Sequence, residues 1–75
     1  MHSLEAFSSR MSELIKEKGL SYKEIAKQAG VNDAAIGYWK MGDRFPSTAS
    51  LVKLAIFFKC STDWLLGLSD ERELQ

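Results

Sequence analysis

The chain has 75 residues, no formal net charge, 45% hydrophobic residues and 27% charged residues. This composition is typical of one small folded domain and excludes a disordered chain. The longest apolar run, Leu54–Phe58, is much shorter than the ~20 residues of a membrane-spanning helix. Residues Met1–Arg10 contain no apolar block of the kind found in secretory signals. We therefore expect a cytoplasmic protein that contacts no membrane.

The residues that metal sites and catalytic triads require are scarce. Cys60 and His2 are the single cysteine and the single histidine, so neither an internal disulfide nor a zinc cluster is expected. The same two residues are too few for nucleophilic catalysis by a triad. The five glycines are dispersed, and none forms part of a glycine-rich phosphate loop. The sequence predicts no metal, no cofactor and no enzymatic activity.

Charge is distributed unevenly along the chain. Up to Thr62 there are nine Lys and Arg against six Asp and Glu, whereas from Asp63 onward there is one Arg against four Asp and Glu. The body is therefore mildly basic and the end acidic. We expect residues 1–68 to form the domain and residues 69–75 to form an acidic tail or a solvated helical extension.

Helical periodicity recurs between short breaks, and no segment alternates as a strand does. The first helix is predicted to be capped by Ser3 and ended by Gly19. The second begins at a capping box formed by Ser21 and Glu24 and ends at Gly30. Their inward-facing residues are Leu4, Phe7, Met11, Leu14 and Ile15 in the first helix, and Ile25, Ala26 and Ala29 in the second.

The third predicted helix is capped by Asn32 and stops at Gly42, with Ile36 and Trp39 facing inward. Ser47 caps a fourth helix and Ser61 a short fifth one, which Gly67 ends. The inward residues of these last two helices are Leu51, Val52, Leu54, Ala55, Phe58, Trp64 and Leu66, with Cys60 and Leu65 forming a hydrophobic staple. We expect both tryptophans to be core residues and Cys60 to be a small buried hydrophobic residue.

Two short helices joined by Ala29–Asn32 have the form of a helix-turn-helix. Ala26 and Ala29 are small where the helices must cross, and Gly30 suits a turn that requires a positive φ. The outer face of the third helix then carries Asp33, Ala34, Gly37, Tyr38 and Met41. In a DNA-binding protein this face lies in the major groove. An ordinary helical hairpin would explain the turn equally well.

The order and spacing of five segments decide between these interpretations. From Arg10 to Leu68 the chain resembles the lambda-repressor-like, Xre-type helix-turn-helix family. The matching segments are Leu14–Ser21, Glu24–Val31, Ile36–Gly42, Pro46–Ser47 with Leu51–Ala55, and Ser61–Gly67. The resemblance implies an all-α, five-helix domain that binds operator DNA, usually as a symmetric homodimer. Because a chain of 75 residues leaves room for one domain, we expect no second domain and no small-molecule effector.

The resemblance also assigns roles to individual positions. Base contacts would fall to Asp33, Ala34, Ala35 and Tyr38. Contacts with the DNA backbone would fall to Tyr22, Asn32, Lys40, Met41 and Arg44, with additional electrostatic attraction from Lys23 and Lys27.

The base-facing positions depart from those of a strong base reader. Arg or Lys recognises guanine and Asn or Gln recognises adenine, but none of these stands among the four predicted base contacts. We expect weak base discrimination or readout of DNA shape, and a shallow salt dependence because few phosphates are neutralised. Affinity would then depend strongly on dimerisation.

A second departure predicts an interface between two copies of the chain. Ile56 lies off the inward face of the fourth helix and, with Leu65, Leu68 and Leu74, is expected to form an exposed apolar patch. Phe57 is expected to enlarge the core instead.

The sequence therefore predicts a DNA-binding transcription regulator that occupies an operator as a repressor. The alternative is a protein-interaction module of the same fold, such as an antitoxin-like or regulator-binding subunit with weakened DNA binding. The zero net charge favours the alternative, whereas the intact turn, Tyr22, Lys40 and Arg44 favour DNA.

Overall fold

Five α-helices follow one another along residues 3–73, the part of the chain that the computed structural model describes; His2 and Leu74 lie outside it. The helices are α1 (Ser3–Lys18), α2 (Tyr22–Ala29), α3 (Asp33–Met41), α4 (Thr48–Phe58) and α5 (Thr62–Leu65). The predicted all-α class and the number of helices are confirmed for these residues. None of the helices in this range is long and apolar enough to cross a bilayer.

The predicted start signals of four helices are confirmed by hydrogen bonds to free backbone N–H groups. Ser21 and Glu24 form the reciprocal capping box of α2. Asn32, Ser47 and Ser61 cap α3, α4 and α5. The prediction for α1 was wrong by one residue, because Ser3 is its first helical residue. At the end of α4, Lys59 adopts the left-handed conformation that glycine adopts after α2 and α3.

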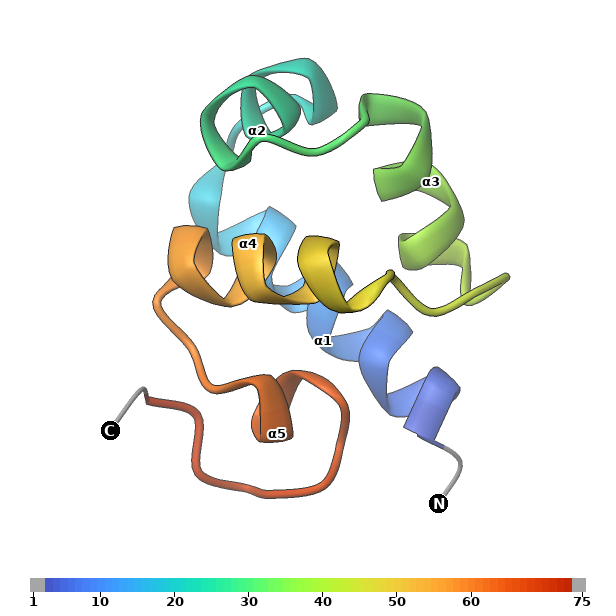
Figure 1. The fold of residues 1–75 in the computed structure, drawn as a ribbon, viewed down its shortest axis with the longest axis vertical. Helices are drawn as coiled ribbons and strands as arrows, with labels where there is room; N and C mark the ends of the chain where they lie inside the picture. Colours follow the sequence, from blue (N-terminus) through green and yellow to red (C-terminus); the bar gives the residue numbers. More distant parts are fainter. Residues whose placement is uncertain (1–2, 74–75) are drawn as a thin grey trace.

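The helices surround one apolar core (Figure 1). In the view of Figure 1, α2 and α3 lie at one end of the molecule, α4 crosses its middle and α5 lies at the other end. Packing joins α3 to both α2 and α1, and joins α5 to both α1 and α4. The largest core side chains that reach no solvent are Phe7, Met11, Leu14, Ile25, Ile36, Leu54 and Leu65.

Most of the predicted core is confirmed. Both tryptophans are buried, and Phe57 is half-buried with its ring edge-on to that of Phe58. Cys60 is fully buried, and burial raises the pKa of its thiol, which disfavours the reactive thiolate. The prediction that Val52 faces inward was wrong, because 45% of its surface is exposed. Lys53 is the single charged residue of α4, so the pattern of apolar residues could not show on which face of the helix Val52 lies.

Of the two alternatives expected for residues 69–75, an acidic tail or a helical extension, the helix is not formed by the described residues 69–73. Residues 69–73 are not helical and fold back along α5, where Ser61 N–H donates to the Arg72 carbonyl (2.7 Å) and the Ser61 hydroxyl to the Glu71 carbonyl (3.1 Å). Arg72 also forms ion pairs with Glu13 and Glu17 of α1. These partners are more than 50 residues apart in sequence, which explains why a local charge pattern could not predict them.

Two arginines tie this segment to Trp64. The guanidinium carbons of Arg10 and Arg72 lie 4.7 and 5.1 Å from the centre of the indole ring, within the range of cation–π attraction. Arg10 also donates to the carbonyls of Trp64 and Ser69 and forms an ion pair with Asp70. Residues 69–73 are thus held mainly by charge and hydrogen bonds.

We expect the Arg72 ion pairs to make stability depend on pH. The hydrogen bond from Arg72 lowers the pKa of Glu17, so its stabilising effect is present above the unfolded pKa of about 4.3 and is lost as the pH falls through the folded value. Arg72→Met should therefore lower the urea midpoint slightly at pH 7, since exposed pairs contribute little, and the difference from wild type should shrink below about pH 4. The exposed Lys16, changed to Met, is the matched control. If the urea midpoints of wild type and Arg72→Met differed by the same amount from pH 7 to pH 3, the ion pair between Arg72 and Glu17 would not be the source of the pH dependence.

Candidate nucleic-acid interface

The connection between α2 and α3 is a tight turn whose polar groups are satisfied locally. Gly30 has φ 81°, and its N–H and that of Val31 donate to the Ala26 carbonyl at 2.9 and 3.1 Å. Asn32 then accepts from the N–H groups of Ala34 (2.8 Å) and Ala35 (3.4 Å). The start of α3 is therefore fixed by the residues that precede it.

The inward face of α3 is buried and its outward face is free. Ile36 and Trp39 are buried in the core, whereas Asp33 and Ala34 are exposed and Tyr38 is 43% exposed. Ala35 is half-buried and packs against the core, so it lies at the edge of the outward face. The structure thus brings three of the four predicted base contacts onto one accessible surface.

Tyr22 of α2 lies against the backbone of α3. A Cβ atom added to Gly37 would be 3.9 Å from Tyr22 Cε2, which is ordinary van der Waals distance. The Lys40 ammonium lies 5.9 Å from the centre of the Tyr22 ring. These two predicted backbone contacts therefore form one cluster at the junction of the two helices, while Lys23 and Lys27 are exposed on α2.

Arg44 lies closer to the outward face of α3 than its place in the sequence suggests. It belongs to the loop after α3, yet its guanidinium carbon is 4.4 Å from the centre of the Tyr38 ring. A cation from outside the helix therefore covers an aromatic residue of the outward face. The predicted backbone contact Met41 is also exposed, at the end of the same helix.

Two polar residues that the sequence analysis missed support the helix-turn-helix. The Ser8 hydroxyl of α1 donates to the Lys40 carbonyl at 2.6 Å, which satisfies a free carbonyl at the end of α3. The Lys53 ammonium of α4 donates to the Gly30 carbonyl in the turn at 3.2 Å. Both contacts join residues more than 20 positions apart, and neither residue type carries a local signal for them.

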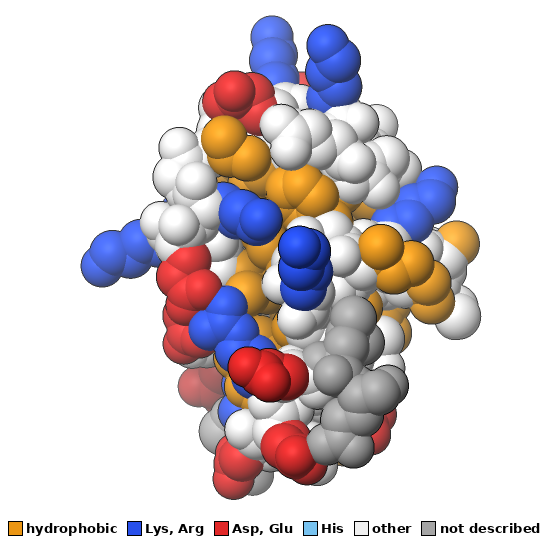
Figure 2. Space-filling view, turned by 90° about the vertical axis from the view of Figure 1, so that its left-hand side faces the viewer, with side chains coloured by type: hydrophobic (Ala, Val, Ile, Leu, Met, Phe, Trp, Pro, Cys, Tyr) orange, Lys and Arg blue, Asp and Glu red, His pale blue; other side chains and the backbone are white. Residues whose placement is uncertain are grey.

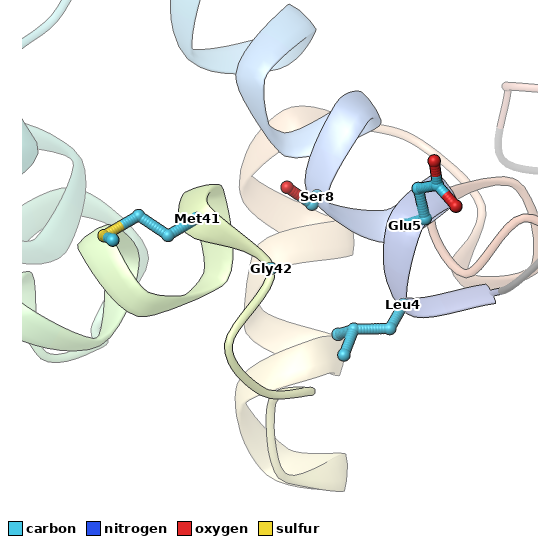
Figure 3. A pocket seen from close by; sticks show the side chains of 5 residues that line it. All are labelled: Leu4, Glu5, Ser8, Met41 and Gly42. Atoms are coloured by element: carbon cyan, nitrogen blue, oxygen red, sulfur yellow. The ribbon is translucent and has the colours of Figure 1, made fainter.

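A shallow pocket of about 280 Å³ lies between the start of α1 and the end of α3 (Figure 3). It is lined by Leu4, Glu5, Ser8, Met41 and Gly42. The Ser8 side chain points toward the end of α3, whereas the Met41 side chain points away from α1. The pocket borders the α3 surface and contains no cluster of polar groups that would suggest chemistry of its own.

The predicted apolar interface is only partly exposed. Ile56 and Leu68 are 65% and 71% exposed, and Val52 lies one helical turn before Ile56 on α4. The inclusion of Leu65 was wrong, because this side chain is fully buried where α5 packs against α1 and α4. Leu74 lies outside the described residues.

Charge on the surface follows the division seen in the sequence. In Figure 2, basic side chains project from the end of the molecule that carries α2, beside acidic ones, and acidic side chains gather at the end that carries α5 and the segment after it. Because DNA is polyanionic, the α2 end is better suited to it than the acidic α5 end.

Comparison with known proteins agrees with this geometry. A helix-turn-helix family model matches residues 11–65. The chain is 28% identical over 65 residues to YobD, an uncharacterized HTH-type transcriptional regulator of Bacillus subtilis (strain 168). The match covers 87% of this chain and 58% of that regulator, so the chain spans less than two thirds of its relative. No solved structure matches significantly.

The family match begins within α1 and runs to the end of α5, so it includes all of α2, α3, α4 and α5 but not the first half of α1, which carries the core residue Phe7. It contains the capped turn, the buried inward face of α3 and the exposed outward face described above. The chain belongs to the lambda-repressor-like, Xre-type helix-turn-helix family.

Proposed function

We propose that this protein is a transcription regulator that binds duplex operator DNA with α3 in the major groove and represses by occupying that site. The proposal is carried by the outward face of α3, which is exposed and flanked by the Lys40–Tyr22 and Arg44–Tyr38 pairs. The family match and the description of YobD as a transcriptional regulator support it.

In this arrangement the first turns of α3 face base edges. Asp33 can accept a hydrogen bond from cytosine, Ala34 and Ala35 can contact a thymine methyl group, and Tyr38 can pack or donate a hydrogen bond. The residues proposed to contact the DNA backbone are Tyr22, Lys23, Lys27, Asn32, Lys40, Met41 and Arg44. Because the side-chain oxygen of Asn32 (Oδ1) already accepts hydrogen bonds at the start of α3, the side-chain NH₂ is the group left to reach a phosphate.

The protein is proposed to act in the cytoplasm as a homodimer, with the exposed Ile56 and Leu68 at the contact between two copies. A two-fold dimer would place its two α3 helices one turn of DNA apart, about 34 Å. The test is selection from a random duplex pool at low salt. Enrichment of a two-fold-symmetric sequence would support the proposal, and no enrichment would favour the protein-interaction alternative.

Lys40→Ala tests the contacts with the backbone. Removing one phosphate contact should weaken binding to the selected duplex and to random duplex by the same factor, and should reduce the slope of log K against log salt by about one per monomer. Fluorescence anisotropy across salt concentrations measures both quantities. Lys16→Ala, at an exposed lysine of α1, is the control and should leave the slope unchanged. A loss confined to the selected duplex would contradict a phosphate contact at Lys40.

A further inference from the structure

The outward face of α3 carries no side chain that can recognise a purine by two hydrogen bonds. Asp33, Ala34, Ala35 and Tyr38 include no Arg, Lys, Asn or Gln, which are the residues that read guanine and adenine in the major groove. If α3 binds specific DNA, a group that donates two hydrogen bonds to one base must come from elsewhere or the readout must be indirect.

Arg44 brings such a group onto this face. Its guanidinium lies over the Tyr38 ring, with 4.4 Å between the guanidinium carbon and the ring centre. A guanidinium has five N–H donors in a fixed fork, so a contact with one ring leaves donors for a further partner. Within residues 3–73 no carboxylate or carbonyl accepts a hydrogen bond from Arg44, whereas the guanidinium groups of Arg10 and Arg72 are both paired. Arg44 therefore presents unused donors beside a position proposed to face base edges.

We propose that Tyr38 and Arg44 act as one reading unit, in which Tyr38 positions the Arg44 guanidinium to donate two hydrogen bonds to O6 and N7 of a guanine. This inference rests on the proposed function, and it changes the role of Arg44 from a backbone contact to a specificity-determining residue and that of Tyr38 from a base contact to a positioning residue. Tyr38 is a positioning residue in this unit, since it acts through Arg44.

The chemistry favours guanine over the other base pairs. Guanine presents two adjacent acceptors in the major groove, which match the fork of a guanidinium, and each such pair contributes about 5- to 150-fold discrimination against the wrong base. The Lys40–Tyr22 pair provides a contrast, because an ammonium is a point charge without a fixed fork and lies farther from its ring, at 5.9 Å. Lys40 thus suits a phosphate and Arg44 suits a base.

The test uses the duplex enriched from a random pool by the wild-type chain, and the same duplex with each guanine replaced in turn by 7-deazaguanine, which lacks the N7 acceptor. For wild type, one replacement per half-site should weaken binding about 10-fold or more. Arg44→Ala should weaken binding to the unmodified duplex about 10- to 100-fold and should make binding insensitive to that replacement.

Variants of Tyr38 test the positioning role. Tyr38→Leu should lose most of the same guanine discrimination, whereas Tyr38→Phe keeps the ring and should retain it. The double variant Tyr38→Leu/Arg44→Ala should bind no more weakly than Arg44→Ala alone, because both changes remove one unit. The upfield ring-current shift of the Arg44 side-chain protons, measured by NMR without DNA, should persist in Tyr38→Phe and disappear in Tyr38→Leu.

Two results would overturn the inference alone, and a third would overturn the proposed function with it. Arg44→Ala could weaken all duplexes equally and reduce the salt slope, which would make Arg44 a phosphate contact. The effects of Tyr38→Leu and Arg44→Ala could multiply, which would make the residues independent. In either case an enriched symmetric duplex would leave the proposed function standing, whereas no enrichment by wild type would overturn both proposals.

Discussion

Replacing Trp39 by alanine should remove a large part of the stability of this protein, because α3 loses the largest side chain of its buried face. Trp39 is a large core side chain that is almost fully buried, and truncating a buried aromatic residue costs about 3–5 kcal/mol. A chain of this length is expected to be stable by only about 4–11 kcal/mol. We expect the melting temperature to fall by about 15–30 °C. Thermal unfolding followed by circular dichroism measures this change.

The neighbouring residue provides the control. Tyr38 lies next to Trp39 on α3 but points outward, so Tyr38→Ala should cost less than about 1 kcal/mol. Trp64 remains in both variants and reports unfolding by its fluorescence. Equal destabilisation by the two changes would contradict the division of α3 into a buried and an exposed face, on which the proposed function depends.

The ends of most helices could be predicted because their signals are local. The capping box of Ser21 and Glu24 involves residues three positions apart, and Asn32 and Gly42 bracket α3 in the same way. Such contacts depend on the backbone of a single turn, so the sequence contains all the information needed. The end of α4 carries no such signal, because a non-glycine residue, Lys59, ends this helix in the left-handed conformation.

Faces of helices were harder to predict where apolar residues are dense or the helix is short. In α4 nearly every residue is apolar, so Val52 could be assigned inward although it is exposed. In α5 four residues provide just over one turn, too few to establish a period, and the burial of Leu65 depends on packing against α1 and α4.

In the candidate site, too, the features that depend on local spacing could be predicted and the contacts between distant segments could not. The inward positions of Ile36 and Trp39 follow from a three-residue spacing, and this spacing also predicted the exposure of Tyr38. The contact of Arg44 with the Tyr38 ring and the hydrogen bond from Ser8 to Lys40 depend on how a loop and a distant helix fold onto α3. No periodicity in the sequence encodes those contacts.

Gly67→Ala should be the most damaging substitution at any glycine of the chain. Gly67 has φ 84°, a conformation that costs an alanine about 1–2 kcal/mol. A Cβ atom at this position would also lie 2.5 Å from the Cβ of Ala6, which is fixed to the backbone of α1 and cannot rotate away. Relieving that overlap requires α1 and the end of α5 to separate, and such overpacking costs about 1–3 kcal/mol more.

Gly19→Ala separates the two costs. Gly19 also has a positive φ, 67°, but a Cβ atom there would meet no atom within 4 Å, so this variant should lose only the conformational term. Urea unfolding of both variants should therefore show Gly67→Ala to be less stable than Gly19→Ala by the cost of overpacking. Adding Ala6→Gly should recover part of the loss in the Gly67→Ala background, whereas alone it should destabilise by about 0.5–1 kcal/mol. If the two glycine variants were equally stable and Ala6→Gly gave no recovery, the close packing of Gly67 on α1 would be refuted, because that packing is the difference between the two sites.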